Sequence, residues 1–232
     1  MLNNYLVSFG QYCSSFFYAA PTAAEQGTQL EQALLQHVAN NNHEAIGALL
    51  IDNHAEEWTD PDEMTFAYSL LHNAIEQGSV QAFEVLVDKL PLNVLTMCTG
   101  DTGQTLPILT VRAEQTAMLR KCVWTLCNRT AAQYNHFLPH SPQTQHTLAR
   151  ADFRAIIDAQ DRDGNTALIH AVFNGHEPSV DLLCIFLAST LIWNDAGDSV
   201  LNLIADLPDD DALAHRVRRR HALETWKNPG QS

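Results

Sequence analysis

Few residues in this sequence have the types and spacing that catalysis needs. The five cysteines lie at positions 13, 98, 122, 127 and 184 without a C-x-x-C pair, and eleven histidines are scattered along the chain. A cysteine thiolate activated by a histidine is a nucleophile, so Cys13 beside a histidine would make a thiol-dependent enzyme. Cys13 lies among aromatic residues, however, which is typical of a buried, unreactive thiol.

Metal and phosphate chemistry have less support still. His136, His140 and His146 form the pattern H-x-x-x-H-x-x-x-x-x-H, but zinc sites usually add cysteine or carboxylate ligands to histidine. The pattern is therefore more typical of a polar surface, and no glycine-rich loop that could hold a phosphate occurs. We expect no catalytic residues, no cofactor and no metal. A binding protein is favoured, and the thiol-dependent enzyme is the alternative.

Charge is distributed unevenly along the 232 residues. Residues 1–88 contain twelve acidic and no basic residues, whereas residues 89–232 contain fifteen acidic and thirteen basic residues, and the net charge is −14. An acidic half repels phosphate backbones, so nucleic acid is not an expected partner. A protein with a basic surface is a better candidate, and simple solubility is the alternative reason for the charge.

We expect neither a membrane span nor a secretory signal in this sequence. No apolar run reaches the ~18 residues of a membrane span, and the start lacks the basic residues of a secretory signal. An odd number of unpaired cysteines indicates free thiols in a reducing compartment. We expect a monomeric cytoplasmic protein.

The stretch DRDGNTALIHAVFNGHEPSVDLL (161–183) predicts two short helices. Gly164 permits a tight turn, Thr166 can cap a first helix, Gly175 can end it, and Pro178 suits the first turn of a second. Helices this short are unstable alone in water, so the unit must stack on copies of itself. The residues expected in the resulting core are Leu168, Ala171, Val180, Leu182 and Leu183.

Copies of this layout occur elsewhere in the chain. Equivalent positions, expected to cap or begin the first helix, lie at 33, 69, 105, 166 and 199, with spacings of 36, 36, 61 and 33 residues. In the second copy Leu71, Ala74, Val85 and Leu86 should be buried. The 61-residue spacing leaves room for a further pair within 128–160, made of TAAQYNHF and TQHTLARADFRAIID around the break PHSPQ. This segment is either a degenerate repeat or an insertion.

These units resemble the ankyrin repeat family, whose pattern is D-x-x-G-x-T-P-L-H-x-A followed by G-H and V-x-x-L-L. Residues 161–183 match it, except that Ala167 replaces the proline, Ile169 replaces the histidine, and His170 follows one place late. The resemblance covers about 28–207. It implies an all-α ankyrin-repeat solenoid of about five to six helix pairs, with a HEAT-like array as the alternative.

Capping helices are expected at both ends of the array. Residues 1–27 predict an N-terminal capping helix, with a membrane-surface helix or a targeting segment as alternatives, and Thr28-x-x-Glu31 is a capping box at the start of the first repeat helix. Residues 208–232 predict a C-terminal capping helix and tail. Its acidic start at 209–211 and its basic stretch at 216–220 suit the helix dipole, and a nuclear-import patch is the alternative for the basic stretch.

The resemblance also implies a concave partner-binding surface of turns and first helices. Partner-touching positions flank each turn and lie late in the first helix. In this sequence they are Glu63, Thr65, Phe66, Tyr68 and Glu76; Thr99, Asp101, Thr102, Gln104 and Arg112; Gln160, Arg162, Asp163, Asn165 and Phe173; and Trp193, Asp195 and Asp198. Phe66, Tyr68 and Trp193 could instead pack inward.

Two further expectations concern residues 56–72. Trp58 lies among Glu56, Glu57, Asp60, Asp62 and Glu63, which predicts an apolar anchor with an acidic rim for a basic partner. The family resemblance implies that His72 hydrogen-bonds the hydroxyl of Ser69. The composition is also similar to that of ankyrin proteins that intracellular bacteria deliver into host cells, which would make the chain an effector.

Overall fold

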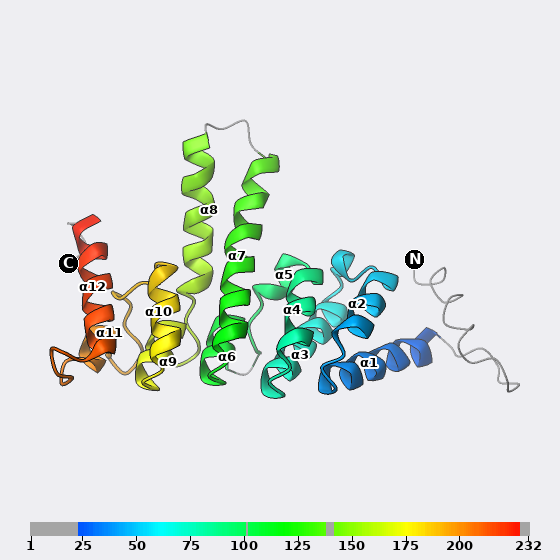
Figure 1. Cartoon of the computed structure of the whole chain (residues 1–232). Helices are drawn as coiled ribbons and strands as arrows, with labels where there is room; N and C mark the ends of the chain where they lie inside the picture. The colour runs from blue at the N-terminus through cyan, green and yellow to red at the C-terminus, as the bar shows by residue number, and fades with distance from the viewer. Residues whose placement is uncertain (1–22, 101, 138–141, 228–232) are drawn as a thin grey trace, which may run out of the picture. The chain divides into compact units, whose positions relative to one another are not determined.

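The computed structural model describes residues 23–100, 102–137 and 142–227 (Figure 1). Within these ranges the chain is all-α, with twelve α-helices, one short 3-10 helix and no β-strand. None of the described helices combines the length and the apolar content that crossing a membrane requires. The chain divides into two compact units, residues 1–94 and 95–232, each described by itself below. The predicted helix at the start of the chain lies almost entirely outside the described residues.

Unit 1 contains two helix pairs. The first pair is α1 (Ala23–Ala39) and α2 (His43–Asp52), and the second is α3 (Pro61–Glu76) and α4 (Val80–Lys89). The short helices η3 (Ala55–Glu57) and α5 (Leu92–Leu95) follow the two pairs. Helix α1 packs on α3, and α2 packs on α4, so the pairs stack with like helices side by side. Leu71, Ala74 and Leu86 are buried as predicted, and Val85 is half-buried.

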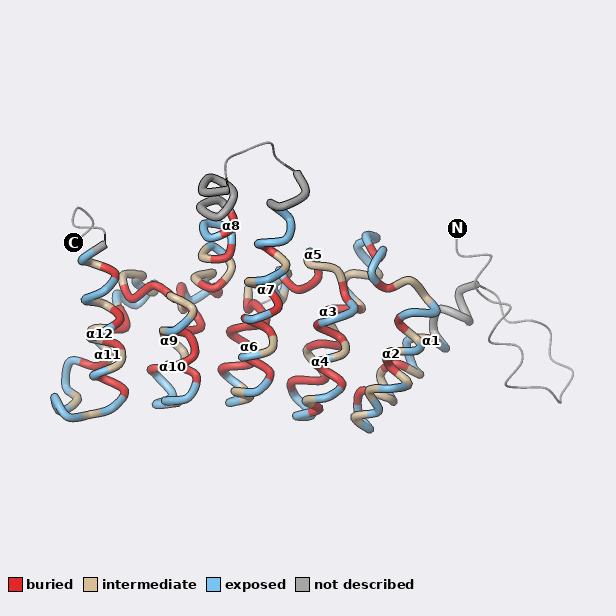
Figure 2. The backbone as a smooth tube through the Cα atoms, turned by 45° about the horizontal axis from the view of Figure 1, so that its top comes forward, coloured by how far each residue is buried: buried red, intermediate tan, exposed pale blue. Residues whose placement is uncertain are grey.

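Unit 2 contains three pairs and one additional helix. The pairs are α6 (Leu106–Arg112) with α7 (Thr116–Phe137), α9 (Ala167–Phe173) with α10 (Glu177–Ile185), and α11 (Val200–Leu203) with α12 (Ala212–Lys227). First helices pack on first helices, and second helices on second helices. The five predicted core residues of 161–183 are all buried. Figure 2 shows buried residues along the facing sides of the paired helices and exposed residues at the turns that join them.

One recurring turn joins the two helices of four pairs. A left-handed residue ends the first helix at Asn41, Gly78, Glu114 and Gly175, with φ between 50° and 65°. In each case the next N–H donates to the carbonyl five residues earlier at 2.9 Å, as Ser79 does to Ala74. This Schellman geometry satisfies carbonyls that the helix end would otherwise leave unpaired. The shared turn sets the same register for the four pairs.

The first helices of unit 2 begin where the sequence predicts. Thr105, Thr166 and Ser199 are the N-caps of α6, α9 and α11. The Thr166 hydroxyl accepts a hydrogen bond from the Ile169 N–H at 3.2 Å, and the Ser199 hydroxyl accepts one from the Asn202 N–H at 3.4 Å. Thr105 makes no capping bond with its side chain, so capping by a hydroxyl is confirmed at Thr166 and Ser199, and at Thr105 only the start of the helix is confirmed.

The first helices of unit 1 begin earlier than predicted. Helix α3 is capped by Asp60, whose carboxylate accepts from the Asp62 N–H at 2.9 Å, and Ser69 lies inside the helix and donates to the Phe66 carbonyl. The predicted Ser69–His72 bond is wrong, because His72 lies 3.7 Å from Glu76 instead. Without the aspartate and glycine of the turn pattern, nothing interrupts this helix. Helix α1 likewise begins at Ala23, so Thr28 and position 33 do not start it.

Residues 128–157 do not form a helix pair separate from α7. TAAQYNHF, predicted as the first helix of a separate pair, is the continuation of α7, which runs for 22 residues. The reason is that 116–137 contains neither glycine nor proline. The additional helix α8 (Pro142–Ile157) returns antiparallel along α7, and the two form a helical hairpin that extends beyond α10 in unit 2 (Figure 1).

Candidate binding surface

The three turns that precede the first helices of unit 2 contain the same kind of hydrogen bond. In each, a polar side chain accepts a hydrogen bond from a backbone N–H across the turn: Thr99 from Gln104 at 2.9 Å, Asp161 from Asn165 at 2.8 Å, and Asn194 from Asp198 at 2.7 Å. Gly103, Gly164 and Gly197 take the left-handed conformation in the three turns. We call residues 99–104, 161–165 and 194–198 the turn row; residue 101 is not described.

Backbone hydrogen bonds link each turn to the next. The Arg162 N–H donates to the Thr102 carbonyl at 3.0 Å, and the Asp195 N–H donates to the Asp163 carbonyl at 3.0 Å. A Cβ added to Gly164 would lie 2.7 Å from the Asp195 nitrogen, so only glycine permits this close approach.

Side chains add a second set of links along the turn row. Arg162 Nη2 donates to the Gly100 carbonyl at 2.7 Å, and Asn194 Nδ2 donates to Asn165 Oδ1 at 2.8 Å. Gln160 Nε2 donates to the Trp193 carbonyl at 2.9 Å. Arg162, Asn165 and Gln160 were predicted to touch a partner, and the structure places them in bonds between neighbouring turns. These bonds hold the turns in fixed relative positions.

The middle turn has a buried polar centre. Asp161 is 8% exposed; its Oδ1 accepts from the N–H groups of Asp163 and Asn165, and its Oδ2 lies 2.7 Å from His170 Nε2. His170, one place late relative to the family pattern, therefore supports the turn through Asp161.

Two aromatic side chains of the predicted surface project into solvent. Phe173 is 76% exposed and Trp193 is 56% exposed. Phe173, Arg112 and Glu76 each end the first helix of a pair and are exposed, so these positions recur as the resemblance implied. Asp163 and Asp195 are exposed in the turn row.

Several predicted site residues are not available to a partner. Trp58 is only 8% exposed; its Nε1 donates to the Asn53 carbonyl at 3.2 Å, and its ring centroid lies 6.3 Å from that of Phe66. The predicted Trp58 anchor is therefore wrong, because its ring packs inward although its acidic neighbours face water. Tyr68 and Gln104 are also buried.

The remaining predicted positions have other surroundings. Glu63, Thr65 and Phe66 lie on α3 rather than on a turn. Thr99 is half-buried and Thr102 is exposed, both in the turn row, and Asp198 is half-buried there. Asp101 lies outside the described residues.

Three of the described cysteines have surroundings that disfavour a nucleophile, while Cys98 is exposed. Burial raises the pKa of Cys122 to about 12 and that of Cys184 to about 11, so neither forms a thiolate readily. Burial also raises the pKa of Cys127. Cys13, on which the alternative enzyme depends, lies outside the described residues, as does much of the region around His140. No group of three potential metal ligands occurs among the residues that the structure describes.

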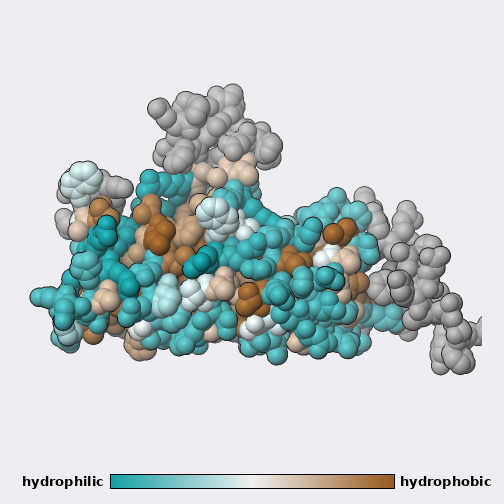
Figure 3. Space-filling view, viewed as in Figure 1, coloured by the Kyte–Doolittle hydropathy of each residue, from teal (hydrophilic) through white to brown (hydrophobic). Residues whose placement is uncertain are grey.

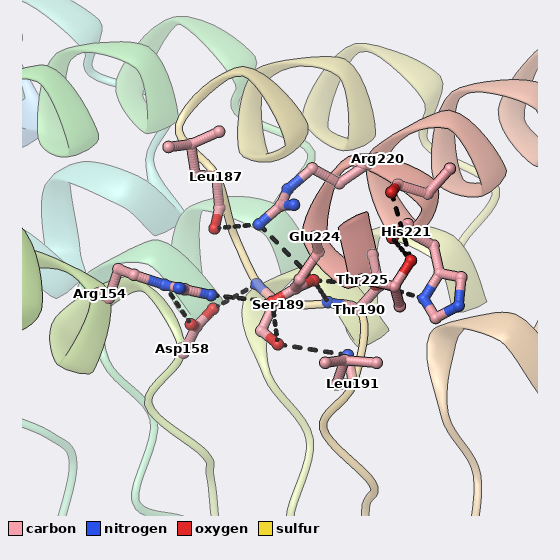
Figure 4. Close-up of polar contacts among 11 residues, drawn as sticks. Arg154, Asp158, Leu187, Ser189, Thr190, Leu191, Arg220, His221, Glu224 and Thr225 are labelled. Atoms are coloured by element: carbon pink, nitrogen blue, oxygen red, sulfur yellow. Dashed lines mark hydrogen bonds and ion pairs between the residues drawn. The ribbon is translucent and has the colours of Figure 1, made fainter. Parts of the chain in front are cut away.

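A buried ionic network lies where α8, the α10–α11 connection and α12 meet (Figure 4). Glu224 Oε1 accepts from Arg154 Nη2 at 2.8 Å and from the Ser189 hydroxyl at 2.9 Å. Its Oε2 accepts from the N–H and hydroxyl of Thr190 at 2.9 and 3.0 Å. Asp158 Oδ1 accepts from the Ser189 N–H at 2.7 Å. These contacts connect helix α8 with helix α12.

The two carboxylates of this network respond differently to their surroundings. Burial would raise the pKa of Glu224, but hydrogen bonds from Thr190 and Ser189 and the charge of Arg220 together hold that pKa below its usual value. Burial raises the pKa of Asp158 despite the hydrogen bond from the Ser189 N–H. No pattern in the sequence predicted this network, since Arg154 and Glu224 are 70 residues apart and carry no local motif.

Comparison with known proteins identifies one stretch of the chain. Residues 145–184 match a protein family described as ankyrin repeats (many copies). Ankyrin-repeat sequence is therefore present over these residues, as predicted from 161–183. The matched region contains most of α8, the middle turn, α9 and nearly all of α10. No curated protein gives a match to the sequence.

Proposed function

We propose that this chain is a non-catalytic protein-interaction module that binds its partner through the turn row of unit 2. The observation that carries the proposal is that Trp193, directly before the last turn of the row, is 56% exposed and that Phe173, at the far end of the first helix α9, is 76% exposed. Large aromatic side chains dominate the binding energy of many protein interfaces. Ankyrin repeats suggest the same general role.

The rigidity of the turn row supports binding. Forming a complex usually costs free energy for ordering loops and side chains at the interface. The backbone links from Arg162 to Thr102 and from Asp195 to Asp163 order these loops before a partner arrives. The surface would therefore bind with a smaller entropic cost than three independent loops.

Charge indicates the kind of partner. Asp163 and Asp195 are exposed in the turn row, and Trp193 directly precedes the last turn. An aromatic anchor with exposed carboxylates nearby suits a partner that presents an apolar side chain surrounded by lysine or arginine. We expect the association rate to fall as salt concentration rises.

Affinity capture with matched variants tests the proposal. The full chain, a Phe173→Ala/Trp193→Ala variant and a Trp226→Ala control are used to capture proteins from a lysate, followed by quantitative mass spectrometry. Trp226 is 78% exposed on α12, away from the turn row in sequence. We expect a partner that the wild type and the control retain and the double variant loses. Equal recovery with all three chains would contradict the proposal.

A further inference from the structure

The α7–α8 hairpin gives unit 2 a second surface that the turn row does not include. Helix α7 has 22 residues whereas its counterpart α10 has 9, and α8 follows α7 in the place where α10 and its successor are joined by a loop. The two helices of the hairpin pack along each other. The α7–α8 hairpin therefore adds a surface beside the second helices.

Two exposed apolar side chains occupy equivalent positions at the foot of this hairpin. Trp124 of α7 and Ile185 of α10 are separated by 61 residues, the offset that also relates the caps Thr105 and Thr166. They are 60% and 72% exposed. Helices α7 and α10 pack on each other, and packed helices lie about 8–10 Å apart. The shared register therefore places both side chains on the same outer side of neighbouring helices.

The end of α8 completes this apolar region. Phe153 of α8 lies with its ring centroid 6.1 Å from that of Phe186, directly after α10. Figure 3 shows apolar surface gathered between α8 and α10. We call Trp124, Ile185 and the Phe153–Phe186 pair the hairpin foot. Phe153 is buried and Phe186 is half-buried, so Trp124 and Ile185 are its side chains left in water, and such exposed apolar side chains are typical of an interaction site.

The charge around the hairpin foot differs from that of the rest of the chain. Residues 106–157 contain six basic and two acidic residues, a net charge of +4, while all other residues together carry −18. Arg120 lies one helical turn before Trp124 and is exposed, as is Arg150 on α8. The acidic residues of α10 that precede Ile185, Glu177 and Asp181, share the single guanidinium of Arg216, which leaves this group one negative charge.

We propose that the hairpin foot binds an acidic, apolar peptide segment of a partner protein. Trp124 and Ile185 would contact the apolar side chains of that segment, and Arg120 would pair with its carboxylates. The exposed Arg120 and the net charge of +4 over residues 106–157 argue against a basic segment, and the −14 of the whole chain argues against a nucleic acid. The inference shares the protein-binding role proposed above but assigns it a second surface with a partner of opposite charge.

Peptide selection tests this inference on the full-length chain. A phage-displayed library of random dodecapeptides is selected on the immobilised wild type, with the Trp124→Ala variant used for counter-selection. We expect enrichment of peptides that combine aspartate or glutamate with leucine or aromatic residues. No enrichment, or enrichment of neutral or basic peptides, would overturn the inference.

Fluorescence anisotropy with the most enriched peptide then measures the contribution of each residue. We expect Trp124→Ala and Arg120→Glu each to weaken binding about tenfold or more. The matched controls Trp226→Ala and Arg219→Glu, both at exposed positions of α12, should stay within about twofold, and circular dichroism verifies that each variant is folded. Equal losses in the controls would overturn the inference, and Arg120→Glu carries the test if Trp124→Ala does not fold.

Two further measurements distinguish peptide binding at the hairpin foot from binding at the turn row and from self-association. Trp193→Ala, which tests the turn row, should leave peptide binding unchanged. The proposal for either surface can therefore be refuted without affecting the proposal for the other. Sedimentation analysis tests a second copy as the occupant, because unit 1 is acidic. Self-association that Trp124→Ala abolishes, without peptide binding, would assign the hairpin foot to a homodimer and overturn the proposed partner.

Discussion

Replacing Gly164 with alanine tests whether the turn row is as closely packed as its hydrogen bonds indicate. Gly164 has φ +75°, and an added Cβ would lie 2.7 Å from the Asp195 nitrogen and 2.9 Å from Asp195 Oδ1. Both contacts are too short for a carbon atom, so the turn at 194–198 must move away. That movement breaks the hydrogen bond from the Asp195 N–H to the Asp163 carbonyl.

The expected cost has two parts. A non-glycine residue in the left-handed region costs roughly 1–2 kcal/mol, and losing the hydrogen bond costs about 1 kcal/mol more. We therefore expect Gly164→Ala to lower the free energy of unfolding by roughly 2–3 kcal/mol. Urea denaturation followed by circular dichroism measures this change.

Gly197 provides the matched control. Its φ is +81°, but no described atom outside its chain neighbours lies within 4 Å of an added Cβ. Gly197→Ala should therefore cost only the conformational strain, roughly 1–2 kcal/mol. If the two variants unfold at the same urea concentration, the close packing between the turns at 161–165 and 194–198 contributes nothing, and the reasoning is refuted.

Three other changes have distinct expected results. Glu224→Gln should destabilise the fold by about 3–5 kcal/mol near pH 7, because it leaves Arg154 and Arg220 without their buried counter-charge, while Asp158→Asn should cost much less, since its amide oxygen can still accept from Ser189. Because folding lowers the pKa of Glu224, its ionised carboxylate stabilises the fold at pH values above the ordinary glutamate pKa of about 4.3. This stabilisation is lost as the pH falls through the pKa of Glu224 in the folded chain. The raised pKa of Asp158 has the opposite effect: it stabilises the fold at low pH, and this stabilisation is lost as the pH rises. Acid titrations of the two variants by circular dichroism check both statements, and an unchanged acid transition in Glu224→Gln would contradict them. Leu183→Ala should cost roughly 2–5 kcal/mol in urea denaturation, since Leu183 is fully buried, and a loss below ~1 kcal/mol would mean that it does not pack in the core. Iodoacetamide at pH 8 should modify the exposed Cys98 before Cys122 and Cys184, and mass spectrometry showing the reverse order would refute the burial argument.

The sequence predicted unit 2 better than unit 1 for a physical reason. The turns before α9 and α11 combine a glycine that can adopt positive φ with a hydroxyl residue two places later, and these local signals determine both the turn and the cap. In unit 1 the second copy has the hydroxyl of Ser69 but Ala67 in place of the glycine, so α3 extends back to Pro61 and Ser69 becomes an interior residue. The repeat spacing alone did not reveal this change.

The exposure of a candidate site residue could be predicted from the sequence only where the neighbouring residues determine it. Phe173 and Arg112 are exposed, as the end of a short first helix predicts, and their contact with a partner stays a prediction. Trp58 was misplaced because its acidic neighbours indicated an exposed segment, whereas its ring packs against Phe66. The network around Glu224 depends on contacts between segments far apart in the chain, which no local pattern in one sequence discloses.

The affinity of unit 2 for a captured partner tests the central claim most directly. Biolayer interferometry would compare the wild type with Trp193→Ala, Phe173→Ala and the control Trp226→Ala against the same immobilised partner. We predict that the first two substitutions weaken binding at least about tenfold, as expected for interface anchors, and that the control does not. Unchanged affinity in the Trp193→Ala and Phe173→Ala variants, with the partner still bound, would contradict the assignment of the turn row as the binding surface.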